Sequence, residues 1–168
     1  MIASAAEPGA AGRRRQVRSV TTDEDLIRTA LAVAATAGPR DVPIGAVVIG
    51  ADGTELARAV NAREALGDPT AHAEILALRE AAAKIGNYRL AGAEVYSTLE
   101  PCVMCAGALV AARVARLVFG ARDLRFGGVR SKFRIADSEA LNHRVEIVEG
   151  VLATECVELL RGFFEKRR

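Results

Sequence analysis

The sequence predicts a single α/β domain in which a mixed β-sheet carries helices on both faces. Three observations support this fold class. The chain has 168 residues, of which 51% are hydrophobic, enough to build one buried core. Short apolar runs bounded by turn residues indicate five buried strands. After an initial pair of strands joined by a tight turn, strands and helical segments alternate, which is typical of a sheet covered on both sides.

The N-terminal segment, residues 1–21, is rich in small residues and arginine and lacks the apolar stretch of a secretory signal. Its scarcity of acids also fits an organelle transit peptide, and an upstream start codon would equally account for it. We expect a disordered N-terminal extension here and place the single domain at residues 22–168. No apolar run approaches the roughly 18 residues that span a bilayer, so we expect no membrane association.

The domain is predicted to begin with a helix followed by a hairpin. Thr22 can cap the helix, with Asp25 as its capping-box partner, and apolar residues then recur at helical spacing until a Gly-Pro pair. The apolar run 44–50 predicts a buried strand. An Asp-Gly pair after it predicts a tight turn, so that residues 55–62 return beside the first strand.

A second helix and a third strand follow. The helix is predicted over residues 72–86, with Asp68 or Thr70 as its cap and Gly86 at its C-terminal end. Residues 93–100 are predicted to form the third strand.

The last third of the chain begins with a helix over residues 101–113, because Pro101 suits the first position of a helix. A long polar and basic connection, residues 122–143, leaves room for one short helix. The other predicted elements are strands at 114–121 and 144–150 and a closing amphipathic helix at 151–168.

Charge is unevenly distributed, although the formal net charge is only +2. Residues 113–134 contain one acid, Asp123, and seven basic residues, Arg113, Arg116, Arg122, Arg125, Arg130, Lys132 and Arg134. A basic segment on a nearly neutral protein suits a polyanionic partner such as nucleic acid. An ordinary solvated surface is the alternative interpretation.

Two of the three cysteines form a C-x-x-C motif. Cys102 and Cys105 are three residues apart at a predicted helix start, so their side chains share a face and feel the positive end of the helix. Such a pair can hold one zinc ion. The third, Cys156, lies in an apolar run and is predicted to be a buried small side chain. An odd number of cysteines does not form a disulfide framework, so we expect a reducing, cytoplasmic setting.

His72 is the better candidate for a third ligand, since it too opens a helix; the other histidine is His143. Three protein ligands leave the fourth position to water, which is the catalytic pattern. Glu74 lies two positions along the helix, roughly 200° away, and is therefore placed to move protons rather than to bind the metal. Two alternatives stand beside this: a thiol-disulfide motif for C-x-x-C, and a satisfied surface pair for His72 and Glu74.

The combined pattern H-x-E…P-C-x-x-C is the signature of zinc nucleobase deaminases. Between Thr22 and Arg168 the chain resembles the bacterial tRNA-specific adenosine deaminases. The matching stretches are PIGAVVI, DPTAHAEILALRE, NYRL, TLEPCVMCAGA, VFGARD, NHRVEI and EGVLATEC, followed by the Phe pair of the last helix.

This resemblance implies the three-layer α/β/α cytidine-deaminase fold with a five-stranded mixed sheet, and a homodimer. It implies one Zn²⁺ per subunit held by His72, Cys102 and Cys105, with Glu74 as the group that moves protons. The implied reaction is the hydrolytic conversion of adenosine 34, the wobble position of a tRNA anticodon loop, to inosine, mainly in an arginine tRNA.

By the same resemblance, five residues are expected to contact the substrate: Asn61, Ala73, Asp123, Arg167 and Arg168. With five Phe, two Tyr and no Trp, we expect phosphate contacts rather than base stacking to dominate RNA affinity, and activity to fall with salt. Two other functions remain open. One is a zinc deaminase of a free nucleobase or nucleotide, such as guanine, cytosine or deoxycytidylate. The other is a catalytically inactive RNA-binding subunit, against which the presence of Glu74 argues.

Overall fold

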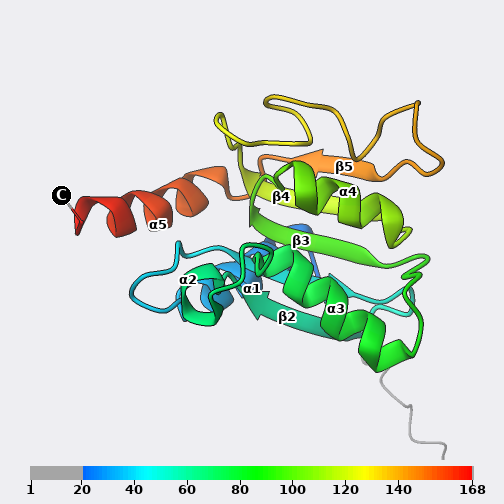
Figure 1. Ribbon diagram of the computed structural model, residues 1–168, viewed down its shortest axis with the longest axis horizontal. Helices are drawn as coiled ribbons and strands as arrows, with labels where there is room; N and C mark the ends of the chain where they lie inside the picture. The colour runs from blue at the N-terminus through cyan, green and yellow to red at the C-terminus, as the bar shows by residue number, and fades with distance from the viewer. Residues whose placement is uncertain (1–20, 168) are drawn as a thin grey trace, which may run out of the picture.

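Five strands form one mixed sheet in the computed structural model, which describes residues 21–167 (Figure 1). Their spatial order is β2-β1-β3-β4-β5. β1 pairs antiparallel with β2 and β3, whereas β3, β4 and β5 run parallel. The predicted five-stranded mixed sheet is therefore confirmed. The strands are β1 (Gly45–Ile49), β2 (Glu55–Val60), β3 (Glu94–Leu99), β4 (Arg116–Ala121) and β5 (Glu146–Glu149).

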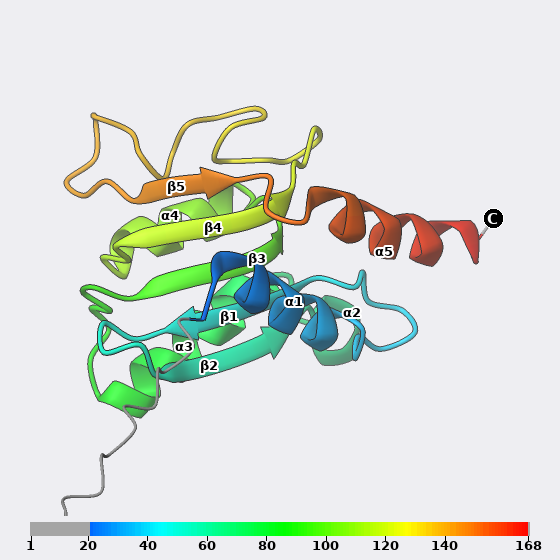
Figure 2. The same cartoon turned by 180° about the vertical axis from the view of Figure 1, so that it is seen from behind.

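Helices cover both faces of this sheet, giving three layers (Figures 1 and 2). One face is covered by α3 (Ala73–Ile85) and α4 (Val103–Ala111), and the other by α1 (Asp23–Ala34) and α5 (Ala153–Glu165). α5 rests on the sheet by its N-terminal part, where Cys156 is buried as predicted, and then extends beyond the sheet edge. None of the helices within residues 21–167 is long and apolar enough to cross a membrane.

The central strands build two separate cores because successive side chains point to opposite faces. Val48 and Val95 join the core beneath α3 and α4, while Val47 and Tyr96 join the core beneath α1 and α5. Burial on both faces explains why β1 forms a continuous apolar run in the sequence.

The ends of the helices correct several expectations. Thr22 and Asp25 form the predicted capping box of α1. α3 and α4 instead begin directly after His72 and Cys102, which occupy the N-cap positions without a capping side-chain hydrogen bond. Pro101 therefore precedes the helix rather than opening it.

The predicted caps of α3 have another role. Asp68 accepts hydrogen bonds from the backbone and hydroxyl of Thr70 in the turn before the helix. Gly86 ends α3 in the left-handed conformation, as predicted.

A four-residue helix, α2 (Arg63–Leu66), occupies a stretch expected to be loop, and the 122–143 connection contains no helix. Residues 1–20 of the expected N-terminal extension lie outside the described part of the chain.

A cluster of ion pairs centred on Arg116 ties α1 to the sheet at the start of β3, β4 and β5. Its guanidinium lies 2.7 Å from Asp23, 3.2 Å from Glu94 and 3.5 Å from Glu146. Hydrogen bonding to Arg116 lowers the pKa of Asp23 below its ordinary 3.8, and hydrogen bonding to Asp23 raises the pKa of Arg116. One cation here holds three carboxylates.

We expect Arg116→Met to lower the free energy of unfolding by about 2 kcal/mol, because it leaves three carboxylates together without their cation. Urea unfolding at pH 7 measures this. The contribution of Asp23 is present above its ordinary pKa and disappears as the pH falls through its lower folded-state pKa, so the difference from wild type should shrink as the pH falls below 3.8. Arg58→Met, which breaks an exposed pair with Glu55, should cost less than about 1 kcal/mol. Equal losses in the two variants would contradict the role given to Arg116.

Candidate active site

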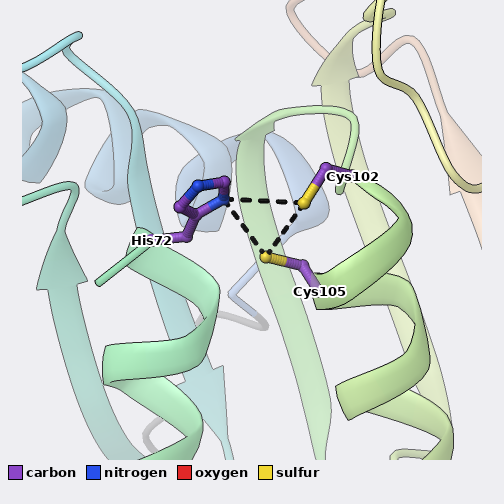
Figure 3. Close-up of side chains that lie close together, drawn as sticks. All are labelled: His72, Cys102 and Cys105. Atoms are coloured by element: carbon purple, nitrogen blue, oxygen red, sulfur yellow. Dashed lines mark hydrogen bonds between the residues drawn. The ribbon is translucent and has the colours of Figure 1, made fainter. Parts of the chain in front are cut away.

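Three potential metal ligands converge between the N-terminal ends of α3 and α4 (Figure 3). Nδ1 of His72 lies 3.6 Å from Sγ of Cys102 and 3.5 Å from Sγ of Cys105, and the two sulfurs are 3.7 Å apart. His72 precedes the first turn of α3. Cys102 precedes α4, and Cys105 is buried in its first turn. The three side chains point toward one another.

These spacings fit a tetrahedral metal centre. Zinc bonds of about 2.3 Å to sulfur and about 2.0 Å to nitrogen place two sulfurs about 3.8 Å apart and each sulfur about 3.5 Å from the nitrogen. All three distances agree with those values within about 0.1 Å. The residues therefore fit the ion, with three protein ligands and a fourth position for a small molecule.

The electrostatics of the cluster favour deprotonated sulfur. The hydrogen bond between the two sulfurs lowers the pKa of Cys102 to about 4 and raises the pKa of Cys105, so Cys102 is the sulfur that loses its proton first. Hydrogen bonding to Cys102 raises the pKa of His72. Both helices also direct their positive N-terminal ends at the cluster, which stabilises negative charge there. His143 lies elsewhere: its Nε2 contacts the carbonyl of Val114.

Glu74 is buried in the first turn of α3, with only 4% of its surface exposed, and does not belong to the ligand cluster. Its Oε1 accepts a long hydrogen bond, 3.4 Å, from the hydroxyl of Ser97. Burial raises the pKa of Glu74, whereas a cation bound by the neighbouring ligands would oppose that shift. A carboxyl held beside a metal but outside its ligand set is suited to holding and releasing a proton.

Two of the expected substrate residues lie close to these elements. Asn61 follows β2 and is 5% exposed; its Nδ2 donates to the carbonyl of Val42. The next residue, Ala62, donates its N–H to Ala71, which directly precedes His72. Ala73 is fully buried, and its methyl group packs in the core beneath α3 and α4.

The buried carboxylate of Glu100 was not identified from the sequence. It is 1% exposed and directly follows β3, immediately before Pro101 and Cys102. It accepts backbone N–H bonds from Asp123, Val129, Arg130 and Ser131, together with the Ser131 hydroxyl. These bonds lower the pKa of Glu100 against the opposing effect of burial. The one available signal was an acid placed directly after a buried strand, which is costly unless it is satisfied.

Two glycines, Gly127 and Gly128, lie between the residues that donate to Glu100, and they pack on the turn that carries Cys102. Gly127 forms a β-bridge with Cys102, and the N–H of Gly128 donates to the carbonyl of Pro101. A Cβ on Gly128 would lie 2.7 Å from the backbone nitrogen of Val103. Only a residue without a side chain permits this approach, so the 123–131 segment supports one metal ligand through its backbone.

Residues 20–121 match the family described as the cytidine and deoxycytidylate deaminase zinc-binding region. The chain belongs to this deaminase family. It is 46% identical over 147 residues to a tRNA-specific adenosine deaminase of Haemophilus influenzae, covering 87% of this chain and 85% of that protein. A protein of the same description from Agrobacterium fabrum is 45% identical over 144 residues, covering 85% and 94% of the two chains.

Two solved structures resemble this deaminase almost equally in shape. One, from a study of A-to-I editing by tRNA:A34 deaminases at the wobble position, has a TM-score of 0.76 at 43% identity and covers 80% of this chain and 98% of its own. A guanine deaminase from Nitrosomonas europaea has a TM-score of 0.73 at 28% identity and covers 87% and 86%. Zinc is the cofactor of the deaminase family, and His72, Cys102 and Cys105 could hold it.

The expected RNA contacts lie in two separate segments of the chain. Asp123 uses Oδ1 to accept the N–H groups of Arg125 and Phe126, which closes a local turn beside Glu100. Arg167 lies at the end of α5, with its guanidinium 4.0 Å from the Phe163 ring and a hydrogen bond to the Pro39 carbonyl. Arg168 lies outside the described residues.

We expect Gly128→Ala to weaken zinc binding by about tenfold, because the new methyl group must displace the backbone of Cys102 and Val103. Competition with a chromophoric chelator measures this affinity. Gly107→Ala is the matched control in α4, since nothing lies within 4 Å of a Cβ there. Unchanged zinc affinity in folded Gly128→Ala protein would show that the glycine contact does not position Cys102.

Proposed function

We propose that this protein is a zinc-dependent hydrolase that converts the wobble adenosine of tRNA, position 34, to inosine, mainly in an arginine tRNA. The observation that most supports this is the zinc-sized cluster of His72, Cys102 and Cys105 beside the buried Glu74, in a chain 46% identical to a tRNA-specific adenosine deaminase. The anticodon stem-loop is the part of the tRNA that enters the site. We also propose that the enzyme is a cytoplasmic homodimer.

His72, Cys102 and Cys105 hold the zinc through Nδ1 and two sulfurs. When bound, zinc lowers the pKa of a water molecule from its bulk value to near neutrality. Glu74 takes up the proton that this water loses and delivers it to N1 of the adenine as the water oxygen bonds to C6. It then takes the proton of the new hydroxyl on C6 and passes it to the amino group, so that the C6–N bond breaks and ammonia leaves. Its burial keeps bulk water from competing for that proton.

Asn61 orients the adenine. Its amide is held by the hydrogen bond from Nδ2 to Val42, which leaves Oδ1 to accept a hydrogen bond from the base. Because the enzyme must reach a base in a loop, the nucleotide is turned out of its stack into the site. Ala73, Asp123, Arg167 and Arg168 complete the proposed substrate contacts; the methyl group of Ala73 is packed in the core, so its contact would come from the backbone.

A deaminase of free guanine is the second candidate. The Nitrosomonas guanine deaminase has nearly the same TM-score as the structure from the tRNA:A34 deaminase study, so the fold does not separate the two substrates. Sequence identity does favour the tRNA substrate, at 43% against 28%.

Glu74→Gln should reduce the turnover rate by at least about 10³-fold while zinc content and RNA affinity stay close to wild type, because the amide cannot accept and release the proton. Inosine formation in a single-turnover assay, zinc content and RNA binding together measure this. Cys102→Ala provides the contrast, since losing a ligand should remove the zinc itself. Normal inosine formation by Glu74→Gln would refute the proton-transfer role.

The substrate is tested by incubating the wild-type enzyme with an anticodon stem-loop that contains adenosine 34, and separately with guanine, cytosine and deoxycytidylate. Ammonia release and inosine formation should occur only with the stem-loop. A stem-loop with guanosine at position 34 is the matched control. Ammonia release from a free base, with none from the RNA, would overturn the proposed substrate in favour of the second candidate.

A further inference from the structure

The cations of the basic segment 113–134 fall into two groups. Arg116, Arg122 and Arg130 form ion pairs, the last two with Glu149 and Asp137, and Arg113 donates to the carbonyl and side chain of Asn142. Four of the seven cations in this segment are therefore engaged by partners within the protein. Within residues 21–167, no ion pair includes Arg125, Lys132 or Arg134.

These three cations lie in two exposed tripeptides, Leu124-Arg125-Phe126 and Lys132-Phe133-Arg134, which we call the rim. Leu124, Phe126 and Phe133 are 73%, 67% and 56% exposed. The tripeptides lie side by side, because the N–H groups of Lys132 and Phe133 both donate to the carbonyl of Gly127, the residue after Phe126. The rim thus combines three cations with two aromatic rings and contains no acid.

The rim borders the candidate metal site. Gly127, which joins the two tripeptides, pairs with Cys102, and the N–H of Gly128 donates to Pro101. The backbone N–H of Asp123, directly before the rim, donates a hydrogen bond to the carboxylate of Glu100. A polymer whose reacting nucleotide sits at the metal therefore has its neighbouring nucleotides within reach of the rim.

We propose that the rim binds the single-stranded RNA that flanks the target nucleotide, with Arg125, Lys132 and Arg134 on phosphates and Phe126 and Phe133 against bases. This rests on the proposed function and adds a binding surface to it. Single-stranded nucleic acid is bound by this combination of cations along the backbone and aromatic faces for the bases. The cations supply most of the affinity and the two rings add to it.

A second copy of this chain is the competing occupant of the rim. Two copies meeting symmetrically through this surface would bring like charges together, since the same patch faces itself in a twofold interface. Three cations against one adjoining acid, Asp123, favour a polyanion instead.

The test replaces all three cations in the Glu74→Gln background, so that binding is measured without turnover. Arg125→Gln/Lys132→Gln/Arg134→Gln should weaken binding of the adenosine-34 stem-loop about 100-fold at ~0.1 M salt, and lower the slope of log affinity against log salt by about 2. The matched control is Lys84→Gln/Arg89→Gln/Arg144→Gln, which removes three exposed cations outside the rim. That control should change neither quantity.

The aromatic part is tested by Phe126→Ser/Phe133→Ser. Loss of stacking should weaken binding by about tenfold and leave the salt slope unchanged, because no charge is removed. Thermal unfolding shows whether each variant is folded, and sedimentation shows whether its oligomeric state changes.

Wild-type affinity and slope in the triple variant would overturn the rim proposal, provided that the wild-type enzyme makes inosine in this stem-loop. Dissociation into monomers with unchanged RNA affinity would also overturn it and assign the rim to a subunit contact. If the wild-type enzyme makes no inosine in RNA, the proposed function itself fails. The outcomes are therefore distinguishable.

Discussion

The geometry of the candidate site depends on how the buried carboxylate of Glu100 is satisfied. Removing a charge from water is expensive unless hydrogen bonds replace the solvent. Here the bonds all come from residues 123–131, and none is an ion pair. The carboxylate therefore folds a long connection back over the turn before α4. Gly127 and Gly128 then lie against Cys102, so a charge that binds no metal supports the position of a residue that can.

Strand direction explains why residues 30 positions apart meet at this point. β1 runs antiparallel to both of its neighbours, β2 and β3, so these two strands point the same way. The segments that follow them consequently start at the same edge of the sheet, and both lead into helices on the same face. His72 enters from the first segment and Cys102 from the second. The two helix ends then face the same small volume and stabilise negative charge within it.

Local patterns explain what was predictable, and distant partners explain what was not. The capping box at Thr22, the hairpin and the association of His72 with the two cysteines follow from short spacings and residue chemistry. Sequence spacing does not reveal that Glu100 accepts hydrogen bonds from residues 123–131, or that Arg116 pairs with Asp23, 93 residues away. For the same reason, the sequence could not separate the paired cations of segment 113–134 from the others. Its charge could be divided only once the partners of Arg116, Arg122 and Arg130 were known.

Metal chemistry and substrate choice therefore belong to different parts of this fold. The fold resembles a guanine deaminase nearly as closely as a structure from a tRNA:A34 deaminase study, so the fold alone does not set the substrate. Differences between substrates must arise where the segments around the metal reach solvent. Residues 123–134 form such a segment. Glu100 binds their backbone beside Cys102, and the side chains of Leu124, Phe126 and Phe133 are exposed to solvent. Such a segment can change its surface residues without moving the metal, provided that the buried carboxylate keeps its donors.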